Sequence, residues 1–530
     1  MLLNTSIQTS SPLQHLPLSS LFFHSPTTIG FRHPIGIRAG IGRTNSIKCS
    51  ISQVHSYGTL DYERRPPLKW SSLYRRISFM DNPELGSSSV LNQWEEEGRK
   101  LTKWELCRVV KELRKYRRYK LALEVYEWMS DQGDRFRLSS SDSAIQLDLI
   151  SKVHGISTAE DYFSGLPKAL KDKRAYGALL NAYAQAQMRE KAEYMMEEMK
   201  SRGYTVHSLP FNVMMTLYMN LREFEKVNSI IAEMVEKNVA LDLYSYNILL
   251  SCCGAMGSME EMEEVFTRMT LDGTVNPNWT TYSTMATMYM KMGQFEKAED
   301  CLKKLESRIT GRDRIPFHYL LSLYSSIGKK EEIYRVWDIY KSSFPSIQNL
   351  GYHAMIASLI RLDDIQGAET IYEEWLLVKT SCDPRIFNLL MGWYIKEGLV
   401  DKAESFLNQV IEVGKPNSST WEILAEGHIS QNRISEALSC MKEATSAEGA
   451  KNWRPKPTNV SAFFSLCEGK GDMTSREGLM DVLRQVGWLE DEAYMSEVNS
   501  SDREGVALKL SVENSRIDAN DADLLLNRLQ

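Results

Sequence analysis

Cysteine and histidine are the residues in this chain whose side chains could hold a metal ion or act as a nucleophile and its base. No two of the cysteines have CxxC spacing, and none is paired with histidine at the spacing of a zinc site. The His-x-Glu and paired CxxC motifs of a zinc deaminase are also missing from the sequence. We therefore predict no metal, no cofactor and no disulfide framework, and interpret most cysteines as small core residues. The eight cysteines are Cys49, Cys107, Cys252, Cys253, Cys301, Cys382, Cys440 and Cys467.

Paired acidic residues could also carry chemistry, because two carboxylates can share a metal ion or a proton. Two such pairs, Asp363-Asp364 and Glu260-Glu261, lie where helices are predicted to begin. Acids at a helix N-terminus stabilise the helix dipole, which explains both pairs without a catalytic role. The sequence also has no Gly-rich phosphate-binding loop. We therefore predict a protein that is not an enzyme and has no small-molecule substrate.

Charge and hydropathy narrow the classes of partner. The chain of 530 residues has a formal net charge of -6, which argues against a surface that is basic throughout but leaves room for a local basic stripe. No segment approaches the run of roughly 18 to 20 apolar residues that would span a bilayer, so we predict no membrane partner.

A helical hairpin is the element that must position any binding residues. In residues 279–313, Tyr282, Met285 and Tyr289 fall at helical spacing, Gly293 interrupts the pattern, and a second apolar stripe begins at Phe295. One such hairpin cannot bury both of its stripes alone and needs neighbours of the same kind. The segment therefore predicts one unit of a solenoid.

Two residue columns repeat at intervals of about 35 residues and give the register of the array. An anchor in the first helix reads Leu106, Ser143, Tyr176, Phe211, Tyr246, Tyr282, Phe317, Tyr352, Phe387 and Trp421. Sixteen places later, a mostly small residue in the second helix reads Ala122, Ala159, Ala192, Val227, Met262, Ala298, Ile333, Ala368, Ala403 and Ala437. Small residues let the two helices approach closely, and we predict that both columns are core. Several repeats also carry a tyrosine seven residues after the anchor, which we likewise assign to packing.

With this register and motifs such as Tyr246-Asn247, Phe387-Asn388 and Gly293-Gln294-Phe295-Glu296-Lys297-Ala298, the chain resembles a plant organellar pentatricopeptide repeat (PPR) protein. Its even spacing is similar to that of the P class. The resemblance implies an all-α fold, a right-handed α-solenoid of about ten to eleven two-helix repeats of about 35 residues. It also implies single-stranded organellar RNA as the partner, bound one base to one repeat.

The resemblance further implies which residues contact the bases. Each repeat would read its base with the residue after the anchor and with the last residue of the repeat, whose short polar groups bond to base edges. Four pairs match the pattern of the family: Asn212 with Asp242 for uracil, Asn247 with Asn278 and Asn388 with Asn417 for pyrimidines, and Ser283 with Asp313 for guanine. Four other pairs depart from it: Gly177 with His207, His318 with Gln348, His353 with Asp383, and Glu422 with Lys456.

Two further sets of RNA contacts follow from the resemblance. Nine residues after the anchor, the cations expected to face the RNA backbone are Lys115, Lys152, Lys291, Arg361 and Lys396; the alternative is a solvated helix face. Two residues before the anchor, the side chains expected to stack on bases are Leu209, Tyr244, Ile315 and Leu350.

The segments outside the repeats complete the predicted domain organisation. Residues 1–49 lack acids and have no basic residue before Arg32, which favours a plastid transit peptide cleaved after Cys49, with the mitochondrion or an ordinary disordered N-terminus as alternatives. We predict an irregular connector over 50–102, ten repeats over 103–456, a degenerate capping repeat over 457–490, and an acidic, mostly disordered tail over 491–530.

Two functions remain open at this stage. The first is an RNA-binding protein of the chloroplast, or alternatively the mitochondrion, that acts in transcript stability, processing, splicing or translation. The second is a helical-repeat scaffold for protein partners, including a ribosome-associated one, which the acidic balance and the irregular pairs favour.

Overall fold

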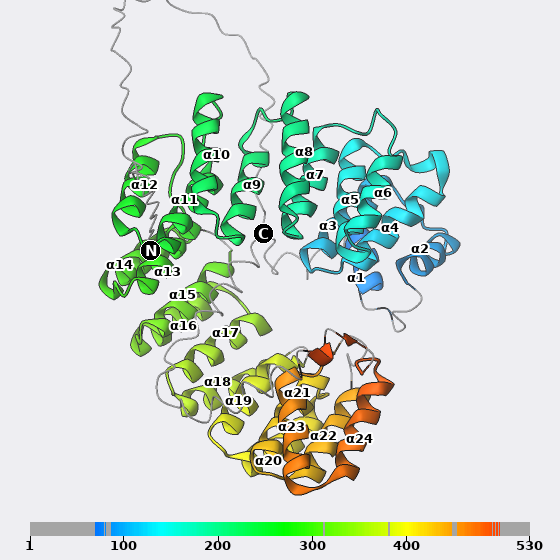
Figure 1. The fold of residues 1–530 in the computed structure, drawn as a ribbon, viewed down its shortest axis with the longest axis vertical. Helices are drawn as coiled ribbons and strands as arrows, with labels where there is room; N and C mark the ends of the chain where they lie inside the picture. The colour runs from blue at the N-terminus through cyan, green and yellow to red at the C-terminus, as the bar shows by residue number, and fades with distance from the viewer. Residues whose placement is uncertain are drawn as a thin grey trace, which may run out of the picture. The chain divides into compact units, whose positions relative to one another are not determined.

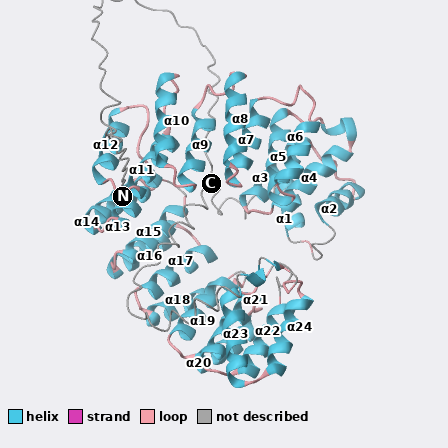
Figure 2. Ribbon diagram, viewed as in Figure 1, coloured by secondary structure: helices cyan, strands magenta, loops and turns pink. Residues whose placement is uncertain are grey.

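The computed structural model describes residues 69–78, 80, 86–310, 313–379, 382–447, 453–489, 491, 492, 494–496 and 498. The regular elements of these residues are helices, without a strand among them (Figure 2). The chain forms two compact units, Met1–Pro277 and Asn278–Gln530. Across the described ranges, every helix is too short or too polar to cross a bilayer. The predicted transit peptide, 1–49, lies outside the described residues.

The first unit contains six helical hairpins and one short 3-10 helix, η4 (Gly133–Phe136). Its α-helices are α1 (Lys69–Ser78), α2 (Gly86–Glu96), α3 (Lys103–Lys115), α4 (Tyr119–Asp131), α5 (Ser140–Val153), α6 (Ile156–Gly165), α7 (Lys173–Gln185), α8 (Arg189–Ser201), α9 (Ser208–Asn220), α10 (Phe224–Glu236), α11 (Leu243–Ala255) and α12 (Met259–Leu271) (Figure 1).

The second unit contains six more hairpins. Its helices are α13 (Trp279–Lys291), α14 (Phe295–Ser307), α15 (Ile315–Ser326), α16 (Lys330–Ser343), α17 (Asn349–Arg361), α18 (Ile365–Val378), α19 (Pro384–Lys396), α20 (Val400–Val413), α21 (Ser418–Ser430), α22 (Ile434–Ser446), α23 (Pro457–Lys470) and α24 (Met473–Gln485).

The hairpins stack through their first helices, which carry odd numbers. Each odd-numbered helix packs on the helix that follows it, and α5, α7, α9 and α11 pack on one another in order. The second unit repeats this arrangement from α13 to α23. Hairpins α3–α4 and α5–α6 meet instead through α4 and α5. Since every hairpin contacts the adjoining hairpins of its own unit, the buried core is a strip that runs from hairpin to hairpin. The predicted all-α fold of stacked two-helix repeats is confirmed in both units.

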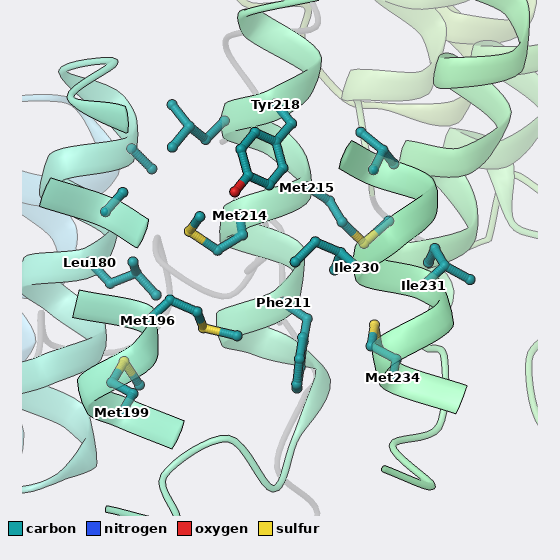
Figure 3. Packing of buried hydrophobic residues seen from close by; sticks show 14 of the residues in the cluster. Leu180, Met196, Met199, Phe211, Met214, Met215, Tyr218, Ile230, Ile231 and Met234 are labelled. Carbon is teal, nitrogen blue, oxygen red and sulfur yellow. The ribbon is translucent and has the colours of Figure 1, made fainter. Parts of the chain in front are cut away.

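The two predicted residue columns form this core. All ten residues of the second-helix column are fully buried, with 0% exposure. Nine of the ten anchors are buried and Trp421 is half-buried. Figure 3 shows part of the strip in the first unit, where Phe211 lies among methionine and isoleucine side chains from neighbouring helices. The regular spacing of these columns along the chain therefore corresponds to one packing contact repeated in every hairpin.

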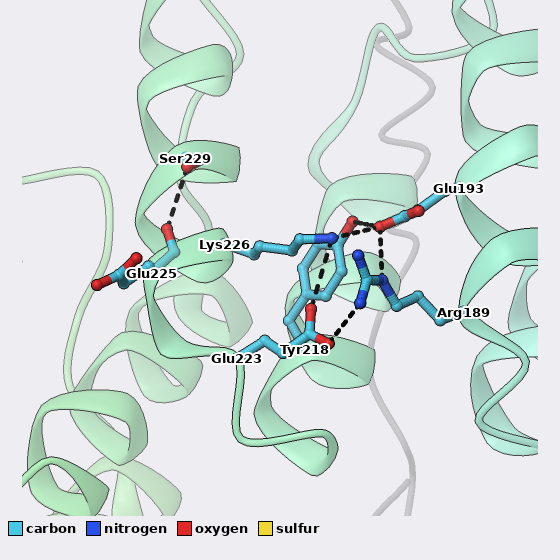
Figure 4. A network of polar contacts seen from close by, with 7 residues as sticks. All are labelled: Arg189, Glu193, Tyr218, Glu223, Glu225, Lys226 and Ser229. Carbon is cyan, nitrogen blue, oxygen red and sulfur yellow. Dashed lines mark hydrogen bonds and ion pairs between the residues drawn. The ribbon is translucent and has the colours of Figure 1, made fainter.

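A tyrosine–glutamate–lysine contact joins successive hairpins, and the sequence analysis did not predict it. The Tyr218 hydroxyl donates a hydrogen bond to Glu193 Oε1 at 3.0 Å, and Lys226 Nζ lies 2.6 Å from the same oxygen (Figure 4). The hydrogen bond from Lys226 holds the pKa of Glu193 below its usual value, which keeps the carboxylate charged. The same contact recurs as Tyr183 with Glu160 and Lys191, and as Tyr394 with Glu369 and Lys402.

The turn between the two helices of a hairpin has a fixed backbone shape. Its second residue has φ of 75° at Gly257 and 72° at Gly293, in the left-handed region that favours glycine. In other hairpins the same place holds a side chain with φ between 54° and 59°, including Arg117 and Arg222. Glycine is therefore favoured at this place but not required.

The prediction of an irregular connector over 50–102 is wrong for α1 and α2. Helix α1 packs on α3 and helix α2 packs on α4, so the two form an additional hairpin before the first predicted repeat. The sequence Gly86-Ser87-Ser88-Ser89 resembles a linker, but it is the first turn of α2. The Ser87 amide donates to Glu124 Oε2 at 2.6 Å, and the Ser87 hydroxyl donates to the Leu121 carbonyl oxygen at 2.9 Å. These contacts come from α4, which is why local composition did not reveal the helix.

The C-terminal end also extends further than predicted. Helices α23 and α24 lie within the predicted capping repeat, 457–490. Beyond it, Tyr494 and Val498 are buried, and the Trp488 indole donates to the Trp453 carbonyl oxygen at 3.2 Å. The predicted boundary of the tail at 491 is therefore too early, because buried side chains continue to Val498. Residues 501–530 lie outside the described part.

Candidate nucleic-acid interface

The last residue of each repeat, predicted to contact a base, stands at the N-terminus of the next first helix. Asp242, Asn278 and Asn417 are the N-cap residues of α11, α13 and α21. Each side chain accepts a hydrogen bond from the backbone amide at the third helical position, at 2.8, 3.1 and 2.9 Å, respectively. The short polar residues that suit base recognition are also the best helix caps, so the sequence signal for this column has two physical origins.

Asn212 and Asp242 form the best-defined predicted pair. Asn212 is 3% exposed, and its Nδ2 donates to the two carboxylate oxygens of Asp242 at 3.1 and 3.3 Å. Its Oδ1 accepts from the Ser245 hydroxyl at 2.7 Å. The structure therefore brings the two predicted residues together across two repeats, and the contacts hold the Asn212 amide in one orientation.

Hydrogen bonds stabilise the negative charge of the Asp242 carboxylate. Burial alone would raise the pKa of this carboxyl, but hydrogen bonds from the Ser208 hydroxyl, the Ser245 amide and Asn212 hold the pKa below its usual value. The Ser208 hydroxyl donates to Asp242 Oδ2 at 2.5 Å. Asp242 is therefore an anionic acceptor at neutral pH that fixes the donor group of Asn212.

Asn388 and Asn417 are also in contact. Asn388 Nδ2 donates to Asn417 Oδ1 at 3.4 Å, a long hydrogen bond, because Asn417 Oδ1 already accepts from the Thr420 amide and hydroxyl. The Asn388 Oδ1 atom is buried and has no hydrogen-bond partner among the described residues. This pair is therefore held less tightly than Asn212 and Asp242, and it has a polar group left for a ligand.

In the Ser283 and Asp313 pair, each side chain bonds to a backbone group close to it in sequence. Ser283 donates to the Thr280 carbonyl oxygen at 2.9 Å, and Asp313 accepts from the Ile315 amide at 3.0 Å. Asp313 precedes Arg314, which is the N-cap of α15, so it stands one place further out than the other members of its column. Asn247 lies on α11 in the first unit, and Asn278 caps α13 in the second.

Two of the pairs that depart from the family pattern have structural roles. The His318 ring is 6% exposed, with Nε2 3.0 Å from the Tyr340 hydroxyl, and burial lowers its pKa to about 4. Glu422 is buried and accepts from the Trp453 indole at 3.0 Å and from the Lys456 amide at 2.5 Å. These side chains hold neighbouring segments in place, which explains why they differ from the short polar residues of the other repeats.

All four predicted stacking residues are exposed at the start of a first helix. Leu209, Tyr244, Ile315 and Leu350 expose 69%, 43%, 41% and 42% of their surface. In α9, Leu209 precedes Asn212 by three residues, so the exposed side chain and the polar one share one helix face. Large apolar side chains that remain in water at one recurring place are available for a ligand surface.

The sequence analysis missed Trp104, which belongs to the same column. Trp104 lies in the first turn of α3, two residues before the anchor Leu106, and is 62% exposed. The Arg108 guanidinium carbon is 5.9 Å from the centre of its ring. The signal was present in the sequence, but the aliphatic anchor and Cys107 made this repeat look unlike the others. Extending the column to every repeat would have found it.

The predicted backbone cations occupy the last turns of α3, α5, α13, α17 and α19. All five are exposed, and positive charge there also stabilises the helix dipole. Lys152 Nζ is 2.9 Å from Asp148 Oδ1, and Arg361 Nη1 donates to the Ser325 hydroxyl at 2.9 Å. Along a first helix, these cations lie about 12 Å from the polar residue after the anchor, so the two predicted sets of contacts occupy different parts of each helix.

Within the described residues there is no group of three or more histidine, cysteine and acidic side chains that could hold a metal ion. Of the seven cysteines in these ranges, none forms a disulfide and five are buried, which confirms the interpretation of most of them as core residues.

Comparison with known proteins gives consistent matches. The model of the PPR repeat family matches residues 207–255, and the PPR repeat model matches residues 174–204, 244–274, 280–308 and 385–414. A pentatricopeptide repeat-containing protein of Arabidopsis thaliana is 56% identical over 532 residues, covering 100% of this chain and 99% of the relative. A mitochondrial pentatricopeptide repeat-containing protein of the same plant is 33% identical, covering 83% of this chain and 89% of the relative.

Two further matches complete the comparison. The Arabidopsis large ribosomal subunit protein mL101 is 34% identical, covering 81% of this chain and 88% of the relative. Among solved structures, maize pentatricopeptide repeat protein PPR10 matches with a TM-score of 0.46 and 18% identity, covering 78% of this chain and 62% of that chain.

Proposed function

This chain belongs to the pentatricopeptide repeat family, and we propose that it binds single-stranded organellar RNA, one base to one repeat, through the face formed by the N-terminal halves of its first helices. By occupying a single-stranded segment, the protein would act in transcript stability, processing, splicing or translation without catalysis. The even repeat spacing supports assignment to the P class. The observation that carries the proposal is the Asn212–Asp242 pair, with the exposed side chains of Leu209 and Tyr244 beside it.

The geometry supports a defined site for one base. Leu209 lies in the first turn of α9 and Tyr244 in the first turn of α11, and these two helices pack on each other. Asn212 and Asp242 come from the same two helix ends. A base placed between the two exposed side chains would have its faces covered and its edge toward the Asn212 amide. Because Asp242 fixes that amide, the repeat presents one arrangement of donor and acceptor to the base.

Base preference is expected to depend on the polar pairs. Read in chain order, the repeats from residue 208 to 417 suggest U, then C or U, then G, two unassigned bases, and then C or U. Replacing both Asn212→Ala and Ser283→Ala should flatten the preference at the first and third bases. Binding should persist, because stacking contributes about 1 to 3 kcal/mol per base whatever the base. Titration of purified protein with RNAs that differ at these positions measures the effect.

A matched variant tests whether this change in preference is specific. Asn408→Ala with Ser405→Ala removes the same two side-chain types from the exposed face of α20 and should leave the preference unchanged. If the wild-type protein binds no single-stranded RNA at low salt, the proposed function is wrong. If it binds RNA but both double variants keep the wild-type preference, reading by these two residues is wrong.

We propose the plastid as the compartment and retain the mitochondrion as the alternative. The acid-free segment 1–49, without a basic residue before Arg32, supports plastid import, whereas several relatives are named as mitochondrial proteins. A fluorescent reporter fused after residues 1–56 is expected to enter plastids in plant cells, because this segment contains the predicted cleavage site after Cys49. A purely mitochondrial reporter would contradict the plastid assignment, and a cytosolic one would contradict organellar import.

A ribosome-associated scaffold remains the second candidate, since one relative is named as a large ribosomal subunit protein, mL101. This function predicts co-sedimentation with a ribosomal subunit that persists after treatment with a nuclease specific for single-stranded RNA. The RNA-binding proposal predicts that this treatment releases the protein from large complexes.

A further inference from the structure

One turn of the molecule is strongly basic although the chain as a whole is acidic. Residues 111–120, the end of α3 and the start of α4, contain six basic side chains and one acidic one in a chain of net charge -6. The basic residues are Lys111, Arg114, Lys115, Arg117, Arg118 and Lys120. This concentration produces a local positive field that the overall composition conceals.

The turn lines an open pocket shared by two repeats. The pocket has a volume of about 390 Å³ and lies between the α3–α4 turn and the C-terminal end of α5. Its lining includes Arg117, Arg118, Tyr119, Lys120 and Lys152 and no acidic side chain. Such a cationic concavity is suited to an anion that is large enough to contact several of these groups at once.

Internal ion pairs leave part of this charge available. The nearby Asp148 carboxylate forms ion pairs with two cations: its Oδ2 is 2.9 Å from Arg114 Nη2, and its Oδ1 is 2.9 Å from Lys152 Nζ. Among the described residues, the exposed Arg117 and Lys120 side chains have no ion pair. The net charge beside the pocket is therefore positive after the structural pairs are taken into account.

Aromatic rings alternate with the cations. Tyr116 is 56% exposed, with Lys115 Nζ 5.5 Å from its ring centre, and the Tyr119 ring lies 4.9 Å from Lys152 Nζ. A surface that offers both cations and an exposed ring matches a nucleic-acid strand, in which every nucleotide has both a phosphate and a base, better than a run of acidic residues.

The hairpin fold does not require this chemistry. Arg117 has φ of 57°, where glycine or asparagine is the favoured residue. The equivalent residue of the hairpin α9–α10 is Arg222, with φ of 58°, but it is followed by Glu223 and Glu225. The same backbone turn therefore carries a mixed charge in one repeat and a concentrated positive charge in the other.

We propose that the pocket beside Arg117 and Lys120 binds backbone phosphates of an RNA segment that extends beyond the bases held by the polar pairs. This inference rests on the proposed function, because it takes RNA as the ligand. The site would add affinity without base preference, since phosphates carry no sequence information. An RNA that reaches the pocket should bind more tightly than a shorter RNA that fills only the repeats from residue 208 to 417.

The test compares the wild-type protein with a double variant that carries both Arg117→Asn and Lys120→Gln. Asparagine suits the positive φ, and both side chains are exposed, so the variant should fold normally, which a thermal melt checks. The probes are a short RNA for the repeats from residue 208 to 417 and the same RNA extended by uridines at either end. The wild type should gain affinity from one of the two extensions, and the variant should lose that gain while binding the short RNA normally. The slope of log affinity against log salt should fall by about 0.7 for each phosphate contact removed.

A control variant, Arg222→Asn with Lys304→Gln, makes the same change of charge at another turn and on α14, and should keep the gain. If the wild type binds the short RNA and neither extension increases the affinity, the proposed site is wrong and the RNA-binding function stands. Equal gains for the wild type and the Arg117 variant would also overturn the site. If the wild type binds none of these RNAs, the proposed RNA-binding function itself has failed.

Discussion

Replacing Ala298→Trp is expected to destabilise the second unit by about 1 to 3 kcal/mol or more, through overpacking. Ala298 is fully buried on α14, which packs on α13 and on α15 of the next hairpin. A tryptophan cannot fit at this close contact unless one of these helices moves. Because the hairpins share one core, the loss of protection should reach α15 as well as the altered hairpin.

Urea unfolding measures the change in stability, and hydrogen exchange shows where protection is lost. Asp300→Trp provides the matched control, since Asp300 is exposed on the same helix and the new side chain can remain in solvent. The control should unfold near the wild-type midpoint. The shared-core description would be contradicted if Ala298→Trp left the exchange of α13 and α15 as slow as in the wild type.

Replacing Leu209, Tyr244, Ile315 and Leu350 together by alanine is expected to reduce RNA affinity by about 100-fold or more, with little change in stability. All four side chains are exposed, so their removal leaves no cavity. Stacking contributes roughly 1 to 3 kcal/mol per base, and each 1.4 kcal/mol is a factor of ten in affinity. The loss should be similar for RNAs of different sequence, because every base has an apolar face.

The matched control removes four exposed apolar side chains from second helices. The control variant has alanine in place of Tyr194, Val235, Ile339 and Ile411. In the wild-type protein these residues expose 70%, 49%, 41% and 46% of their surface, respectively. Binding titrations and thermal melts of the two variants separate loss of a ligand surface from loss of folding. Equal affinity in the two variants would show that the first turns of the first helices do not form the base-binding face.

Features repeated along the chain were accessible from the sequence. The anchor and small-residue columns identified the core, since burial of one helix stripe is a local pattern that recurs with the repeat. The residues two places before the anchor followed from the family resemblance, applied in the same register. Trp104 was missed only because the column was not extended to its repeat. These predictions needed the period and the residue types, and no knowledge of which side chains meet.

Features made by contacts between distant residues needed the structure. The polar residues at the repeat ends are helix caps as well as candidate base contacts. Only the structure shows that Asn212 donates a hydrogen bond to Asp242, and that Glu422 accepts hydrogen bonds from Trp453 and Lys456. Residue type alone could not separate these roles, because hydrogen bonding across a repeat depends on how two hairpins pack.

The sequence by itself determined the register, the helical hairpin and the family, because each rests on a short pattern repeated many times. Only the tertiary structure decided that α1 and α2 are helices, since their apolar faces are stabilised by α3 and α4 rather than by local propensity. It also decided where charge collects: Arg117 and Lys120 lie beside Lys152 of the next repeat. Residues more than 30 positions apart come into contact through the stacking of hairpins, and the pattern of residues along the sequence does not show which of them are neighbours in space.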